Sequence, residues 1–117
     1  MFVAVYRWRL HPKREAQFRE GWSRITRIAR ERCGSGGPAL IREMDGTWCT
    51  IARWPSADTR ARCFASGSLD PEASELMRRA VIEALPDLEM ELDTSAITAD
   101  PTCPRQQRSP WAAWSFP

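Results

Sequence analysis

The sequence contains few of the groups on which metal, haem and membrane proteins depend. It has one histidine, His11, and its four cysteines form no CxxC pair, so the ligand spacing of a zinc site is missing. No apolar run approaches the roughly 18 residues of a membrane-spanning helix, and the N-terminal stretch lacks a signal-peptide pattern. We therefore expect no bound metal, no membrane contact and a cytoplasmic location. We expect Cys49 and Cys63 to be small buried hydrophobic residues.

Lysine is also scarce, because Lys13 is the only lysine among 17 basic residues, yet the net charge is only +2. An arginine-rich chain can bind phosphate groups. Here glutamates lie between the arginines along the chain, namely Glu15, Glu20, Glu31, Glu43 and Glu75. A nucleic-acid-binding protein gathers one sign of charge on one face, so this mixture predicts a solvated surface and no nucleic-acid partner.

The stretch 39–56 predicts a β-hairpin that leads directly into a helix. Asp45-Gly46 is a strong signal for a two-residue turn, which requires positive φ angles. Residues 47–54 are rich in aromatic and β-branched side chains, as a half-buried strand should be. Ser56 follows the proline that ends this strand and is expected to cap the next helix.

Hydrophobic periodicity predicts the other elements, which are a strand over 2–10, helices over 13–32, 56–65 and 71–85, and a last strand over 88–93. Asp70 and Pro71 are expected to begin the last helix, and Pro86 to end it. The order β-α-β-β-α-α-β predicts an α+β fold of the ferredoxin-like split βαβ type, with a four-stranded antiparallel sheet.

Both faces of the predicted sheet carry apolar side chains, because Tyr6 and Trp8 point to one face while Val3 and Val5 point to the other. Helices can cover only one face. We therefore expect a homodimer in which the uncovered sheet faces pack together.

The last strand is expected to lie antiparallel beside the first. That pairing would set two arginines of the first strand against three acidic residues of the last, which are Arg7 and Arg9 against Glu89, Glu91 and Asp93.

The composition changes near residue 99, where four of the nine prolines fall in a stretch without periodicity. We therefore expect one domain over 1–98 and a Pro/Trp-rich tail over 99–117. The tail is either disordered or docked on its own domain or a partner subunit through Trp111, Trp114 and Phe116.

Three stretches carry a resemblance to a known family, namely FVAVYRWRLHPKREAQFREGW, the DGTW hairpin and IARWPSADTRARCF. The chain resembles the antibiotic biosynthesis monooxygenases (ABM family) over 1–97. The resemblance implies a dimeric α+β barrel with a pocket between the sheet and its own helices. It also implies the oxidation of a small aromatic substrate of the anthrone or quinol type by O₂, often without metal or flavin, so no cofactor is expected.

The resemblance also suggests two catalytic residues. Trp54 matches the pocket tryptophan of the family, and Thr50 stands four residues earlier, where antibiotic-type members often place an asparagine. A threonine hydroxyl offers one hydrogen-bond donor in place of the two of an amide. Arg60 stands where some members have a tyrosine.

Further side chains are expected to bind the substrate, which are Tyr6, Phe18, Trp22, Trp48, Arg60, Phe64 and Met77. Each also has a plain structural interpretation, as part of the core or, for Arg60, as a solvated surface residue.

Two functions remain open at this stage. The first is a cofactor-independent monooxygenase in which Trp54 and Thr50 orient the substrate and oxygen. The second is a non-catalytic dimeric domain of the same fold that binds a small apolar ligand or serves as a scaffold. The sequence offers no evident general base, and His11, in the loop after the first strand, does not match the axial histidine of haem-degrading relatives.

Overall fold

The computed structural model describes residues 1–93, so the predicted tail over 99–117 lies outside the described residues. The strands are β1 (Phe2–Leu10), β2 (Leu40–Arg42), β3 (Trp48–Trp54) and β4 (Val81–Glu91), and the helices are α1 (Glu15–Cys33), α2 (Ala57–Cys63) and α3 (Pro71–Ala80). A short 3-10 helix over Pro12–Arg14 precedes α1. Every strand pairing is antiparallel, and the strand order is β2-β3-β1-β4. The predicted α+β class and four-stranded antiparallel sheet are confirmed.

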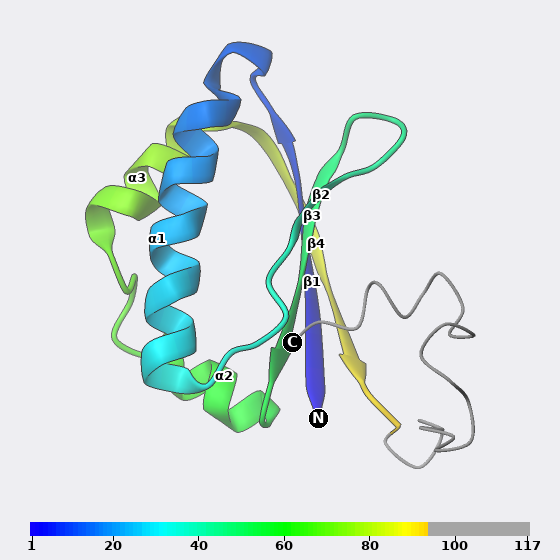
Figure 1. Cartoon of the computed structure of the whole chain (residues 1–117), viewed down its shortest axis with the longest axis vertical. Helices are drawn as coiled ribbons and strands as arrows, with labels where there is room; N and C mark the ends of the chain where they lie inside the picture. Colours follow the sequence, from blue (N-terminus) through cyan, green and yellow to red (C-terminus); the bar gives the residue numbers. More distant parts are fainter. Residues whose placement is uncertain (94–117) are drawn as a thin grey trace, which may run out of the picture.

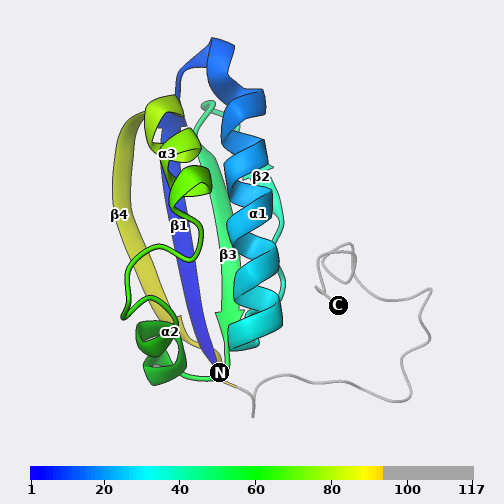
Figure 2. The same ribbon diagram turned by 90° about the vertical axis from the view of Figure 1, so that its left-hand side faces the viewer.

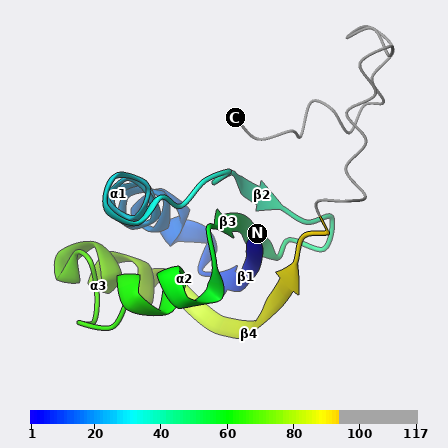
Figure 3. The ribbon, with the colours of Figure 1, turned by 90° about the horizontal axis from the view of Figure 1, so that it is seen from below.

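The helices lie on one face of the sheet, with α1 and α3 side by side and α2 near one end (Figures 1 and 3). The side chains at Phe2, Ala4 and Leu10 of β1 point toward this layer and are buried. Figure 2 shows the two long helices in front of the sheet. No helix in the described part of the chain is long and apolar enough to cross a membrane.

The helix boundaries follow the capping signals in the sequence. The Ser56 hydroxyl accepts a hydrogen bond from the Thr59 backbone N–H at 3.1 Å, and the Asp70 carboxylate accepts one from Ala73 N–H at 3.0 Å. Gly34 ends α1 with φ of 70°, a left-handed conformation that glycine adopts without a steric penalty. The predicted caps of α2 and α3 are confirmed.

The prediction that the last helix continues to residue 85 is wrong. α3 ends at Ala80, and β4 begins at once with Val81 and Ile82, two β-branched residues that favour a strand. Pro86 lies inside β4 rather than ending a helix. β4 is an edge strand, and a register shift between Val5 and Arg7 of β1 leaves one extra residue in β4 at this point. Proline is tolerated in a sheet at such an edge and bulge.

The predicted two-residue turn is also wrong. β2 ends at Arg42 and pairs there with Trp48, so five residues connect the strands. The Gly46 N–H donates to the Glu43 carbonyl at 2.9 Å, and only Gly46, with φ of 91°, has a positive φ in this loop. A two-residue hairpin turn of the expected type would need positive φ at Asp45 as well.

The antiparallel pairing of the first and last strands is confirmed, but the predicted ion pairs are not. The bulge in β4 sets Phe2 opposite Glu91 and Ala4 opposite Glu89. Arg7 instead forms a bidentate ion pair with Glu43 at 2.9 Å, and Arg9 lies 3.5 Å from Glu83.

The cysteines differ from expectation at one position. Cys49 is buried and free, as predicted, but Cys63 forms a disulfide with Cys33. The bond joins the C-terminal end of α1 to the C-terminal end of α2, which contributes no fully buried residue of its own. Disulfides are rare in the reducing cytosol. The cytoplasmic location stays a prediction, and this bond argues against it.

Candidate functional site

The hydrophobic core is divided into two clusters of buried side chains. One cluster contains Phe2, Ala4, Ala29, Ala52 and Trp54. The other contains Leu10, Phe18, Trp48 and Ala80. A pocket of about 170 Å³ lies between the sheet and the helices, and residues of both clusters or packed against them line it. An engineered cavity of about 150 Å³ in another protein binds benzene, so this pocket has room for an aromatic ring.

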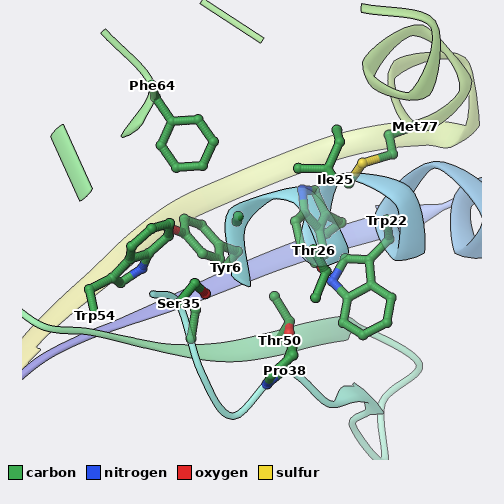
Figure 4. A pocket seen from close by; sticks show the side chains of 13 residues that line it. Tyr6, Trp22, Ile25, Thr26, Ser35, Pro38, Thr50, Trp54, Phe64 and Met77 are labelled. Atoms are coloured by element: carbon green, nitrogen blue, oxygen red, sulfur yellow. The ribbon is translucent and has the colours of Figure 1, made fainter. Parts of the chain in front are cut away.

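The pocket wall is built by four elements and two loops, and most of it is apolar carbon (Figure 4). The lining residues are Tyr6 and Trp8 of β1, Trp22, Ile25, Thr26 and Ala29 of α1, Ser35 and Pro38 of the following loop, Thr50, Ala52 and Trp54 of β3, Phe64 after α2, and Met77 of α3. The four α1 residues recur at spacings of three, one and three, so they form one face of the helix.

Six of the nine residues proposed from sequence line this pocket, which are Tyr6, Trp22, Thr50, Trp54, Phe64 and Met77. The other three lie elsewhere. Phe18 is fully buried in the second core cluster, and Trp48 lies in the same cluster with the guanidinium groups of Arg19 and Arg42 over its ring. Arg60 lines an adjacent surface hollow, which shares Tyr6 and Phe64 with the pocket.

Trp54 supplies a buried hydrogen-bond donor. Its side chain is only 2% exposed, and its ring packs edge-on against Phe64 with ring centroids 5.6 Å apart. The indole Nε1–H has no hydrogen-bond acceptor among the described residues. It lies close enough to the Tyr6 hydroxyl to help lower the pKa of that group, but not in hydrogen-bonding geometry. A buried donor without an acceptor destabilises the protein. A bound ligand that accepts a hydrogen bond from Trp54 Nε1–H would remove this cost.

Tyr6 lies at the same end of the pocket as Trp54 (Figure 4). Its hydroxyl oxygen accepts a hydrogen bond from Arg60 Nε at 2.7 Å. Burial raises the pKa of the Tyr6 hydroxyl above its usual value, although the hydrogen bond and charge of Arg60 oppose this rise. Tyr6 is therefore a neutral phenol at neutral pH and can donate its hydrogen.

Thr50 is buried, and its hydroxyl already has a partner. Thr50 Oγ1 donates to the carbonyl oxygen of Ala39 at 2.8 Å. Its single hydrogen is therefore in use, and what remains toward the pocket is a hydrogen-bond acceptor. This side chain cannot replace the two donors of an amide at the same position.

The lining residues include no carboxylate and no histidine. Within the described part of the chain, no group of three or more His, Cys, Asp and Glu side chains could hold a metal ion. The chemistry available from this pocket is therefore hydrogen bonding by hydroxyl and indole groups on an apolar floor.

The site residues proposed from the sequence did not include seven of the lining residues, which are Trp8, Ile25, Thr26, Ala29, Ser35, Pro38 and Ala52. Ile25 and Ala29 belong to the apolar stripe of the first predicted helix, so their helix face was available as a signal. Ser35 and Pro38 lie in a glycine-rich loop, whose path the sequence pattern does not predict.

No protein-family model matches the sequence, and no curated protein matches it. Solved structures do resemble it. SnoaB, a cofactor-independent oxygenase from Streptomyces nogalater, aligns with a TM-score of 0.62 at 19% identity, over 78% of this chain and 91% of that chain. A structure described as an antibiotic biosynthesis monooxygenase aligns with a TM-score of 0.64 at 13% identity, over 79% of this chain and 98% of that one.

The chain has the fold of the antibiotic biosynthesis monooxygenases. A conserved protein from Methanosarcina mazei Go1 also aligns with this chain, with a TM-score of 0.65 at 10% identity, over 76% of this chain and 89% of that chain. At such identities the ABM likeness describes the fold, and the function must be argued from the pocket.

Proposed function

We propose that the protein binds a small aromatic molecule carrying a phenol or ketone oxygen and oxidises it with O₂ without a cofactor. The buried Trp54 Nε1–H, which has no acceptor among residues 1–93, carries this proposal. Together with the Tyr6 hydroxyl it offers two donors at one end of an otherwise apolar pocket (Figure 4). SnoaB, a cofactor-independent oxygenase with the same fold, supports the reaction type.

The reaction that suits this pocket places the electrons on the substrate. An anthrone or quinol that has lost a proton becomes an electron-rich anion, whose charge is shared between its oxygen and the carbons of its rings. Donors that already point at that oxygen stabilise the anion without reorganisation. For an anthrone, the balance is that a CH₂ group and O₂ give a C=O group and water, so one oxygen atom enters the product.

The protein contributes orientation and exclusion of water in this proposal. Trp22 and Met77 lie on the side of the pocket away from Trp54 and form apolar walls for the rings. Thr50 offers an acceptor, so it is suited to a substrate hydroxyl. Because no carboxylate or histidine lines the pocket, the substrate must be acidic enough to lose its proton to water or to the buffer.

Oxygen uptake tests the proposal directly. The metal-free protein is mixed with anthrones, naphthols and hydroquinones, and the Trp54→Phe variant serves as the comparison. This variant keeps an aromatic ring but removes the indole donor. We expect uptake above the uncatalysed rate for the wild-type protein and a loss of about 10²-fold in the variant, as for a lost oxyanion donor. No uptake with any compound that binds would reject the oxygenase reaction.

The second candidate is a binding domain without catalysis. One observation favours it, namely that the Thr50 hydroxyl donates to Ala39 instead of facing the ligand as a donor. Binding of an aromatic compound in the pocket, measured by calorimetry without oxygen uptake, would establish this alternative.

The protein is further proposed to act as a homodimer through the sheet face that the helices leave open. Val3, Val5 and Ile51 lie on that face, with Val5 buried and the other two half-buried, next to Leu88 and Met90, which are 50% and 46% exposed. Such an apolar patch is unusual on a monomer. Light scattering is expected to give twice the monomer mass, and a Leu88→Glu variant is expected to give the monomer mass.

A further inference from the structure

Arg60 contacts Tyr6 at the donor end of the pocket, and each of its three side-chain nitrogens forms a hydrogen bond. Nε donates to the Tyr6 hydroxyl at 2.7 Å, Nη1 to Glu89 at 3.1 Å and Nη2 to Asp87 at 3.1 Å. The Arg60 side chain is 21% exposed, so this network is partly shielded from solvent. Three of the five N–H donors of Arg60 are thus used, and two carboxylates balance its charge, so Arg60 is not placed to bind an anionic substrate itself.

The two carboxylates reach Arg60 because of the bulge in β4. The extra residue of β4 lies opposite Tyr6, where Val5 pairs with Leu88 and Arg7 pairs with Leu85. Asp87 belongs to this bulge, and Glu89 follows two residues later, so both carboxylates meet the guanidinium from one strand. A planar guanidinium held by two carboxylates and a phenol has little freedom to rotate.

This fixed guanidinium restricts the Tyr6 hydroxyl. A phenol oxygen has one hydrogen and accepts through its lone pairs. Arg60 Nε–H occupies the acceptor side, and the nearby Trp54 indole is also a donor, so the Tyr6 hydrogen points away from both.

The charges around Tyr6 disfavour a ligand whose negative charge is confined to one small group, such as a carboxylate. Arg60 of α2 brings one positive charge, while Asp87 and Glu89 of β4 bring two negative ones. The residues of α1 and β3 that line the pocket beside Tyr6 carry no charge, namely Trp22, Ile25, Thr26, Ala29, Thr50, Ala52 and Trp54.

We propose that Arg60 is a positioning residue, which directs the Tyr6 hydroxyl hydrogen into the pocket and thereby selects aromatic ligands with a phenol or ketone oxygen over aromatic carboxylates. Arg60 acts through Tyr6 and does not touch the ligand. The ligand selection rests on the proposed function, whereas the effect of Arg60 on Tyr6 does not.

The chain offers a clean test of the coupling, because Tyr6 is its only tyrosine. The tyrosinate absorbance band in a pH titration therefore reports this one hydroxyl. We expect Arg60→Gln to raise the midpoint, since a neighbouring cation and hydrogen-bond donor that lower the pKa of Tyr6 have been removed. Arg60→Lys keeps a positive charge, so its midpoint is expected to lie between those of the wild-type protein and Arg60→Gln.

Arg62 supplies the matched control, because it lies on the same helix, carries the same charge and is exposed. Arg62→Gln is expected to leave the midpoint unchanged. An Arg60→Gln midpoint equal to that of the wild-type protein, in a variant whose circular dichroism is unaltered, would overturn the coupling. An equal rise in Arg62→Gln would overturn it as well, because the effect would then be one of net charge.

Ligand binding tests the selection. Calorimetry compares naphthol, naphthalene and naphthoate, and we expect the wild-type protein to bind naphthol best. Tyr6→Phe and Arg60→Gln are each expected to weaken naphthol binding about tenfold, the usual value of one hydrogen bond, and to leave naphthalene unaffected. The double variant should be no weaker than Tyr6→Phe alone, because both changes remove the same interaction.

The two proposals fail in different ways. Additive losses in the double variant, an equal loss for naphthalene, or tight binding of naphthoate would overturn the role of Arg60 in selection. If the wild-type protein binds none of the three compounds, the proposed function and the selection both fall, while the titration still decides whether Arg60 controls Tyr6.

Discussion

Gly21 of α1 lies so close to Ala73 of α3 that a Cβ atom added to Gly21 would be 2.4 Å from the Ala73 carbonyl oxygen. The same atom would be 2.7 Å from Cγ of Met77, a residue of the pocket wall. The Met77 side chain can rotate, but the Ala73 carbonyl can retreat only if α3 moves. The spacing of the two long helices, and with it one wall of the pocket, therefore depends on a residue without a side chain.

We predict that Gly21→Ala destabilises the protein by about 1–3 kcal/mol, the usual cost of overpacking. In an unconstrained helix the same change would stabilise by roughly 1 kcal/mol, so the sign of the effect is decisive. Urea unfolding measures it. Ser23→Ala, on an exposed position of α1, is the control and should change stability little. Increased stability in Gly21→Ala would contradict the close contact.

The folded protein should lose stability in alkaline solution because of Tyr6. Burial raises the pKa of Tyr6 in the folded state above its value of about 10 in the unfolded chain. The folded state therefore holds the Tyr6 proton more tightly than the unfolded chain does. The contribution of the protonated Tyr6 to the free energy of unfolding is fully present below pH 10 and is lost as the pH rises through the folded-state pKa. Unfolding free energies measured across this range should fall less steeply in Tyr6→Phe than in the wild-type protein.

A second group titrates in the same direction and has to be separated. Burial also raises the pKa of the Cys49 thiol. For this reason the comparison is made between Tyr6→Phe and the wild-type protein, both of which keep Cys49. Identical alkaline slopes in the two proteins would mean that Tyr6 is as solvated in the folded state as in the unfolded one.

Loss of the Cys33–Cys63 disulfide should cost about 3–4 kcal/mol in the chain-entropy view, because the bond joins residues 30 apart in sequence. The expected measurement is a lower urea midpoint for the wild-type protein under reducing conditions. A Cys33→Ala/Cys63→Ala double variant should be insensitive to the reductant. If reductant lowers both midpoints equally, the bond is not the cause.

Reduction should also act locally before it acts globally. α2 contributes no fully buried residue, and the disulfide anchors its C-terminal end to α1. Amide exchange in α2 is therefore expected to accelerate in the reduced protein more than exchange in β1 or β3. Equal acceleration throughout would indicate that α2 is held by other contacts.

Local patterns predicted much of this fold. The alternation in β1, the apolar stripe of α1 and the caps at Ser56 and Asp70 each depend on residues close together in sequence, so they could be read directly. β4 could not, because Val81, Ala84 and a following proline also fit a helical stripe with a stop. Only the pairing of β4 with β1 decides between helix and strand for this segment, and that pairing joins residues far apart in sequence.

The site was predictable to a similar extent. The inward face of β3 placed Thr50 and Trp54 together, and helix periodicity placed Trp22 near them. The position of Arg60 beside Tyr6, held by Asp87, was beyond sequence reasoning. It depends on a single extra residue in β4, and a register error of one residue would move every later side chain of that strand to the other face.

Because the core is divided into two clusters with the pocket between them, the protein without a ligand has a gap in its interior. Close-packed interiors lose contacts along such a gap, and an aromatic guest would restore them. By mass action, any compound that binds in this gap stabilises the folded state in proportion to the logarithm of its concentration over its Kd, and it therefore raises the melting temperature. The melting temperature measured in the presence of each compound can therefore rank a library of aromatic phenols and ketones as ligands before any reaction is known.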